Sequence, residues 1–289
     1  MSHGARKGVI VTDLDNTLWD WFDSWYRSFS AMVARLTELS GVSQAELERQ
    51  IREIHRRRGT TEYSLLVREV PALIAAAAPE SPSVVFDEAV HVLNARRKAT
   101  TKLYPGVRQA LDELKRCGVT IVAYTESIAY WTEWRVRHTG LDGVIDVLYS
   151  APDHDWPAGV TADEVRTLPP SEYGLKQTRH QHVPSGVLKP NVEILHSILD
   201  EQGFQPEQAV YIGDSLMKDI AMAQEAGVLD AHAQYGQVQT RAEYDLLRRV
   251  SHWSDEDVAR EREIAQSAGL ITPTIVCRNS FAEVVPYFQ

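Results

Sequence analysis

Asp13 and Asp15 stand two residues apart and directly follow the apolar run of residues 8–12. Two like charges at about 4 Å repel each other by ~4 kcal/mol at an effective dielectric near 20. A divalent cation would offset this repulsion, because Mg²⁺ prefers carboxylates, waters and a substrate oxygen as its ligands. The pair therefore predicts a divalent-cation site directly after this apolar run.

Further polar side chains follow two other apolar runs, residues 119–124 and 209–213, and one lysine begins the helix expected before the second run. In an open parallel sheet the ligand binds at the carboxyl ends of the strands. We therefore expect these side chains to meet Asp13 and Asp15 at one edge of a sheet. They are acids, hydroxyls and a lysine: Thr125, Glu126, Ser127, Lys189, Asp214, Ser215 and Asp219.

The elements that must position these residues alternate between strand and helix, which predicts an α/β fold with a doubly wound parallel sheet. Between the first two strands lie four stretches of amphipathic helical pattern with no strand among them, which predicts an inserted helical domain. We expect a core of residues 1–19 and 104–289 and a helical cap of residues 20–103. The strands are predicted at residues 8–12, 119–124, 144–149, 209–213 and 228–233, with a possible edge strand at 273–277.

Two stretches of the core depart from this alternation. Residues 150–186 hold five prolines and three glycines and are predicted to form a long irregular insertion. Three histidines lie there, His154, His180 and His182, and without a fourth ligand in zinc spacing they are interpreted as ordinary loop residues. Residues 237–270 are polar with a helical pattern. The roles of both stretches stay open.

Four short motifs, in this order, resemble those of the haloacid dehalogenase-like (HAD) superfamily. The resemblance covers about 200 residues of the expected core. It implies a Rossmann-like core with a helical cap between the first and second motifs, and an enzyme of the phosphatase type. The motifs are "DLDNTL", "VAYT", "LKPN" and "GDSLMKD".

The resemblance also implies roles for the first two acids and a metal site. Asp13 would attack phosphorus and become an aspartyl-phosphate, which divides a hard hydrolysis into two easier steps. Asp15 would give a proton to the leaving oxygen and later take one from water. Mg²⁺ would bind the carboxylates of Asp13 and Asp214 and the backbone carbonyl of Asp15, with Asp219 as a further or water-mediated partner.

The phosphoryl group would be held by the remaining motif residues. Thr125 and backbone amides near Asn16 and Glu126 would bind its oxygens, and Lys189 would balance the charge of nucleophile and phosphoryl group. Glu126 stands where the family often has a small or amide residue. Its side chain is predicted to touch the leaving group or the cap, or else to be a solvated loop residue.

The cap is predicted to select the substrate, because the core residues are all used on the phosphoryl group and the metal. The best candidate for a core-facing turn is "RRRGTTEY". Gly59 permits a tight reversal, Thr60 and Thr61 offer hydroxyls, and Arg58 offers a planar donor for an anionic group. Positive charge at the end of a helix is also favoured by the helix dipole, so a structural role for the arginines stays open.

Composition narrows the class of protein. A net charge of −10 argues against general nucleic-acid binding. Cys117 and Cys277 have no metal-ligand spacing and indicate reduced thiols. The N-terminus lacks a long apolar signal region, and the longest apolar run is too short to cross a membrane. We expect a cytoplasmic protein that acts on a small phosphate ester, with no nucleic-acid or membrane partner; its oligomeric state stays open.

Four alternatives to a phosphomonoesterase are open. A metal-independent 2-haloacid dehalogenase would lack the second acid of the first motif, so Asp15 counts against it. A phosphomutase has the same core, with a cap that keeps water out between two transfers. A phospho-receiver module needs no cap, and residues 20–103 count against it. A non-catalytic ligand-binding member would be expected to lose a motif, and none is lost.

Overall fold

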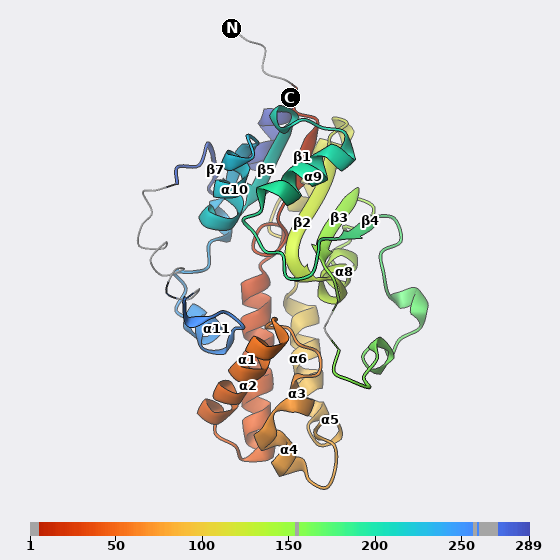
Figure 1. Ribbon diagram of the computed structural model, residues 1–289, viewed down its shortest axis with the longest axis vertical. Coiled ribbons are helices and arrows are strands. Elements are labelled where there is room, and N and C mark those ends of the chain that lie inside the picture. The colour runs from red at the N-terminus through yellow and green to blue at the C-terminus, as the bar shows by residue number, and fades with distance from the viewer. Residues whose placement is uncertain (1–5, 154–155, 257–258, 260–270) are drawn as a thin grey trace.

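A computed structural model describes residues 6–153, 156–256, 259 and 271–289. Figure 1 shows an α/β core with a group of helices attached below it. The core contains one seven-stranded sheet in which every pairing is parallel, so the predicted fold class is confirmed. No helix among these residues is long and apolar enough to cross a membrane.

The strand order is β4-β3-β2-β1-β5-β6-β7, so β1 lies between β2 and β5 at the point where the order reverses. Such a reversal opens a crevice beyond the carboxyl ends of the central strands, where α/β proteins bind their ligands. Both sheet faces are buried: Ile10 packs on one side, and Val9 and Val11 pack on the other. The strands are β1 Val9–Thr12, β2 Thr120–Ile128, β3 Val147–Ala151, β4 Arg179–His182, β5 Ala209–Gly213, β6 Leu229–Ala233 and β7 Ile275–Cys277.

Helices follow most of these strands. Asn191 caps α9 by accepting the N–H of Ile194 at 2.9 Å, and Gly203 ends this helix in the left-handed conformation. A single π-helical turn, η4, follows β5 and carries the fourth predicted motif. The core helices are α7 Val107–Arg116, α8 Ala129–His138, α9 Val192–Gln202, η4 Leu216–Ile220, α10 Ala221–Glu225, α11 Tyr244–Val250 and the 3₁₀ segment η6 Phe281–Phe288.

The cap is helical, but two of its four predicted helices are wrong in extent. The third helix, predicted at about residues 61–78, is split because Pro71 can start a helix and forces the preceding Val70 into an extended conformation with ψ of 112°. Residues 61–63 are not helical, and the fourth helix, predicted at about residues 83–98, is broken at Phe86. The cap helices are α1 Trp21–Ser40, α2 Gln44–Arg58, α3 Leu66–Glu69, α4 Pro71–Ala77, α5 Pro82–Val85 and α6 Asp87–Thr100.

The segment 150–186 is not irregular throughout, and that prediction is wrong for β4. The Asp142 carboxylate accepts the backbone N–H groups of residues 176–178 at 2.7–3.0 Å and holds the chain against the sheet. On β4, His180 bonds to Glu133 at 2.9 Å and to Ser150 at 2.8 Å. The polar sequence of this edge strand gave no apolar signal, and His154 lies outside the described residues.

A third chain segment joins core and cap, besides the two linkers near residues 19–20 and 103–105 where the chain enters and leaves the cap. We call residues 237–250, which end in α11, the strap; its apolar side chains belong to the cap's hydrophobic cluster. The strap's Val250 carbonyl oxygen lies 2.6 Å from Nδ1 of His55 on α2. Its Arg241 guanidinium donates to the Asp20 carboxylate at the first linker, at 3.0 Å. The strap therefore attaches the cap to the core in addition to the two linkers. Residues 257–258 and 260–270 lie outside the described range.

Candidate active site

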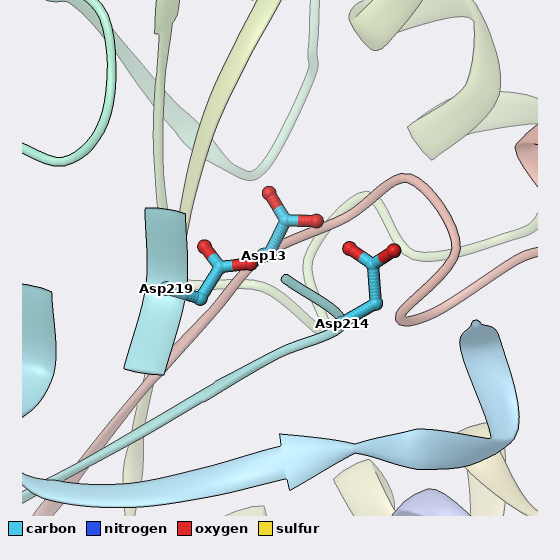
Figure 2. Close-up of side chains that lie close together, drawn as sticks. All are labelled: Asp13, Asp214 and Asp219. Atoms are coloured by element: carbon cyan, nitrogen blue, oxygen red, sulfur yellow. The ribbon is translucent and has the colours of Figure 1, made fainter. Parts of the chain in front are cut away.

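Three carboxylates meet at the carboxyl edge of the sheet. Asp13 follows β1, Asp214 follows β5, and Asp219 lies on η4. One oxygen from each lies within 4.8 Å of the others, and Figure 2 shows Asp13 between the other two. Parallel pairing of β1 and β5 brings Asp13 and Asp214 together, because the two strands end at the same level.

Lys189 completes this group, which we call the acid cluster (Asp13, Lys189, Asp214 and Asp219). Its side chain is 2% exposed, and Nζ donates to Asp13 Oδ1 at 2.7 Å and to Asp219 Oδ1 at 3.0 Å. Glu126 positions the loop that carries this lysine. One Glu126 oxygen accepts the backbone N–H of Lys189 at 2.6 Å, and the other accepts from Lys218 Nζ at 2.5 Å. Glu126 is thus bonded to the protein at both oxygens.

Asp219 is held more firmly than Asp13. Besides Lys189, it accepts the Tyr211 hydroxyl at 2.9 Å and the Ser215 N–H at 3.1 Å. A Cβ added at Gly213 would lie 2.3 Å from the Asp219 carboxyl carbon, so only glycine leaves room for this side chain. The second oxygen of Asp13, in contrast, has the Thr17 hydroxyl at 3.4 Å. Asp13 is the better placed of the two to engage a ligand.

Burial and repulsion dominate the electrostatics of the acid cluster. Burial raises the pKa of Asp13 to about 7, with Lys189 opposing and Asp219 adding to the rise. Burial, then Asp13 and Asp219, hold the pKa of Asp214 well above its usual range. Burial alone would lower the pKa of Lys189, but Asp13 and Asp219 raise it well above its usual value. Three carboxylates face one ammonium, so the cluster has room for positive charge, and its oxygen ligands suit a hard divalent cation.

Asp15 has a different set of partners from Asp13. Its Oδ1 accepts Trp19 Nε1 at 2.6 Å and its Oδ2 accepts the Ser127 hydroxyl at 2.5 Å. Arg135 Nη1, on α8, lies 4.0 Å from Oδ1. The second acid of the first motif is therefore fixed by the loop after β1 and by the end of β2. Sequence reasoning named Ser127 but missed Trp19 and Arg135.

Two of the four residues predicted to bind the phosphoryl group are Thr125, on β2, and Asn16, in the loop after β1. Buried Thr125 lies near the end of β2, and its hydroxyl accepts the Ser127 N–H at 3.1 Å. Asn16 adopts a positive φ of 60°, a conformation that asparagine tolerates better than most residues. Its own N–H donates to the Trp19 carbonyl at 2.8 Å, so this amide is used within the loop. Phosphoryl binding by these residues stays a prediction.

Residues 8–227 match the family of haloacid dehalogenase-like hydrolases. The chain belongs to this family. It is 25% identical over 243 residues to a glyceraldehyde 3-phosphate phosphatase of Methanopyrus kandleri, a match that covers 80% of this chain and 85% of the relative. The resemblance of the four motifs is thereby confirmed at the level of the family.

Solved structures share the fold of this HAD-like hydrolase. A 2-haloacid dehalogenase of Pseudomonas syringae superposes with a TM-score of 0.56 at 20% identity, over 98% of this chain and 97% of the other. A candidate beta-phosphoglucomutase of Thermotoga maritima superposes with a TM-score of 0.51 at 17% identity, over 96% of each chain. At such identities the likeness concerns the fold alone.

We call residues 56–63, the turn predicted to select the substrate, the specificity turn. It lies on the cap side that faces the sheet (Figure 1). Gly59 ends α2 with a φ of 65°. Arg58 donates to Glu69 at 2.6 Å, inside the cap, and the Thr60 hydroxyl accepts the N–H of Glu62 at 3.1 Å. Substrate selection by this turn stays a prediction. Within this turn, Glu62 contacts the core, where it bonds to Arg135 and Trp131.

Glu62 belongs to a second buried group, which we call the interface cluster (Asp15, Glu62, Arg97 and Arg135). Glu62 and Arg97 come from the cap, and Arg135 from the core helix α8. No sequence pattern indicated this group, because its cap and core members lie far apart along the chain and in no shared motif. Burial would raise the pKa of Glu62, but Arg135 and Arg97 outweigh it and lower the pKa.

Proposed function

We propose that this HAD-like hydrolase is a Mg²⁺-dependent phosphomonoesterase that acts on a small phosphorylated metabolite through an aspartyl-phosphate. The observation that carries the proposal is the acid cluster, in which three carboxylate oxygens lie within 4.8 Å of one another beside Lys189. The name of the Methanopyrus kandleri relative supports a phosphate ester as substrate. A small triose phosphate is therefore among the first substrates to test.

The donor set fits Mg²⁺, which takes oxygen ligands and keeps several waters. Asp13 and Asp214 would supply carboxylate oxygens, and Asp15 its backbone carbonyl. Both oxygens of Asp219 are already hydrogen-bonded, to Lys189, Tyr211 and the Ser215 N–H, which suits a partner that acts through water. When bound, the cation would screen the negative charge of nucleophile and phosphate from each other.

The residues of the chain would then carry out two transfers. Asp13 attacks phosphorus and the P–O bond to the leaving group breaks, while the leaving oxygen takes the proton of the Asp15 carboxyl group. Asp15, now a carboxylate, removes a proton from water, and the resulting hydroxide attacks the aspartyl-phosphate. Phosphate departs and the Asp13 carboxylate is restored. Thr125 would donate to the phosphoryl oxygens, and Lys189 would stabilise their charge.

The test is hydrolysis of p-nitrophenyl phosphate and of a panel of small phosphate esters that includes glyceraldehyde 3-phosphate. We expect release of inorganic phosphate that requires Mg²⁺ and stops when the metal is chelated. Asp13→Asn should fold normally and lose turnover by roughly 10⁴-fold or more, because an amide is no nucleophile. Asp15→Asn should be severely impaired. Full activity in Asp13→Asn would refute the mechanism, and phosphoryl transfer without phosphate release would indicate a phosphomutase.

A further inference from the structure

The interface cluster places a charge from the cap beside the proton-transferring acid of the core. Glu62 lies in the coil after α2, and its Oε1 accepts a hydrogen bond from Arg135 Nη2. Arg97, on α6, approaches the same oxygen at 3.7 Å. Two indole N–H groups fix Glu62: Trp21 donates to its carboxylate at 3.1 Å, and Trp131 donates to its backbone carbonyl at 2.8 Å.

Arg135 stands between two acids that belong to different domains. Its side chain is 3% exposed, and a buried guanidinium is costly unless it is paired with a carboxylate. Nη2 is bonded to Glu62, whereas Nη1 is buried and has no hydrogen-bond partner among the described residues. The carboxylate within reach of Nη1 is Asp15, whose Oδ1 lies 4.0 Å away. A small rotation of the guanidinium would close this gap.

We propose that Glu62 and Arg135 are positioning residues for Asp15, an inference that rests on the proposed function. With the cap seated, Glu62 holds the Arg135 guanidinium and leaves Asp15 to its partners Trp19 and Ser127. When the cap withdraws, Glu62 leaves, and Asp15 is the carboxylate that remains within reach of Arg135. An Arg–carboxylate pair is directional and often uses both oxygens, so Asp15 would be turned away from the leaving group.

This arrangement makes proton transfer depend on the seated cap. The proton of the Asp15 carboxyl group must reach the leaving oxygen as the P–O bond breaks, and a carboxyl group bound by Arg135 is not in position. Arg135 and Glu62 do not touch the reacting atoms. Their effect should therefore appear only with substrates whose leaving group needs a proton.

The experiment compares two phosphate esters with Mg²⁺ present. An alkyl phosphate has a poor leaving group that needs the proton. In contrast, 2,4-dinitrophenyl phosphate releases 2,4-dinitrophenolate, a stable anion that leaves without a proton. The kcat/KM value reports the steps up to formation of the aspartyl-phosphate, so slow dephosphorylation does not obscure the comparison. The variants are Glu62→Gln, which keeps volume but removes charge, and the double variant Glu62→Gln/Arg135→Gln.

Glu48→Gln is the matched control. Glu48 is another buried cap carboxylate, but its partner is Arg249 on the strap. General acid catalysis contributes roughly 10²–10⁴-fold, so displacement of Asp15 in Glu62→Gln should cost the alkyl ester about 10–100-fold. The aryl ester should stay within about threefold of the wild type, and Glu48→Gln should affect both esters alike. The double variant should recover about tenfold or more on the alkyl ester, because the competing guanidinium is gone.

Two results would overturn the inference. One is an equal loss of kcat/KM on both esters in Glu62→Gln, which would mean that Glu62 only holds the cap in place. The other is a double variant as slow on the alkyl ester as Glu62→Gln, with both proteins folded by thermal unfolding. Failure of the proposed function is distinct from either, because the wild-type protein would then hydrolyse neither ester in the presence of Mg²⁺.

Discussion

The acid cluster and the interface cluster each gather four charged side chains in or near the interior, and they differ in charge balance. The acid cluster sets three carboxylates against one ammonium, whereas the interface cluster sets two carboxylates against two guanidinium groups. The pKa values follow this difference: those of Asp13 and Asp214 are raised, and that of Glu62 is lowered. An unbalanced cluster needs a ligand from outside, while a balanced one links parts of the protein to each other.

The largest effect should follow from removal of the one cation in the acid cluster. Lys189→Met leaves the buried carboxylates of Asp13 and Asp219 without their ammonium partner and should lower the free energy of unfolding by about 3–5 kcal/mol without metal. Mg²⁺ should restore part of this loss, as measured by urea unfolding at several Mg²⁺ concentrations. Lys218→Met is the control, since its pair with Glu126 is 44% exposed on the lysine side and should contribute about 0–1 kcal/mol. Equal losses in the two variants would contradict the comparison.

Loss of a cation from the interface cluster should also destabilise the protein, but without rescue by metal. In Arg135→Met, Glu62 keeps Arg97 at 3.7 Å, so we expect a loss of about 3 kcal/mol, at the lower end for a broken buried pair. The measurement is the same urea titration. If Mg²⁺ stabilised Arg135→Met more than the wild type, the interface cluster would be part of the metal site and the distinction would fail.

Within the acid cluster, the two outer carboxylates should differ in metal affinity. Outer partners of a metal site typically contribute about 10–100-fold, which we expect for Asp219→Ala. Asp214→Ala should raise the dissociation constant of Mg²⁺ further, because we assign it to direct coordination. Calorimetric titration with Mg²⁺ measures both. The reverse order would mean that the two roles are exchanged.

Stability without metal should depend on pH. The pKa of Asp13 is raised from 3.8 to about 7 in the folded protein, so between these values the folded state binds more protons than the unfolded chain. The stabilisation is complete below about pH 4 and is lost as the pH rises through about 7, with a slope of at most ~1.4 kcal/mol per pH unit for this group. Urea unfolding of Asp13→Asn should give a flatter profile, and Mg²⁺ should flatten that of the wild type. An unchanged slope in Asp13→Asn would place the titration elsewhere.

The smallest effect concerns the specificity turn. Thr61→Ala removes one hydroxyl, and one hydrogen bond is worth about 0.5–1.5 kcal/mol. We expect relative kcat/KM values among phosphate esters to change by up to about tenfold, while a small generic ester is spared. A uniform loss on every ester would make the turn structural.

The acid cluster could be predicted from the sequence because short-range rules govern it. An apolar run of five residues predicts a buried strand, and parallel strands end at a common edge, so Asp13 and Asp214 had to meet there once the topology was inferred. Helix ends follow local rules as well: Ser43, of a residue type that favours helix starts, caps α2, and Gly59 ends it. These signals depend on neighbours in sequence or on one rule of sheet topology.

Tertiary structure alone decided the interface cluster, the strap and β4. Glu62 and Arg135 are 73 residues apart. Because any buried acid can pair with any arginine, the sequence around either residue does not identify its partner. The apolar side of α11 was compatible with the core as well as with the cap, where it packs. The polar strand β4 is held by the Asp142 carboxylate and by pairing with β3. Such long-range contacts have no periodicity along the chain, because their geometry is set only when segments distant in sequence pack together.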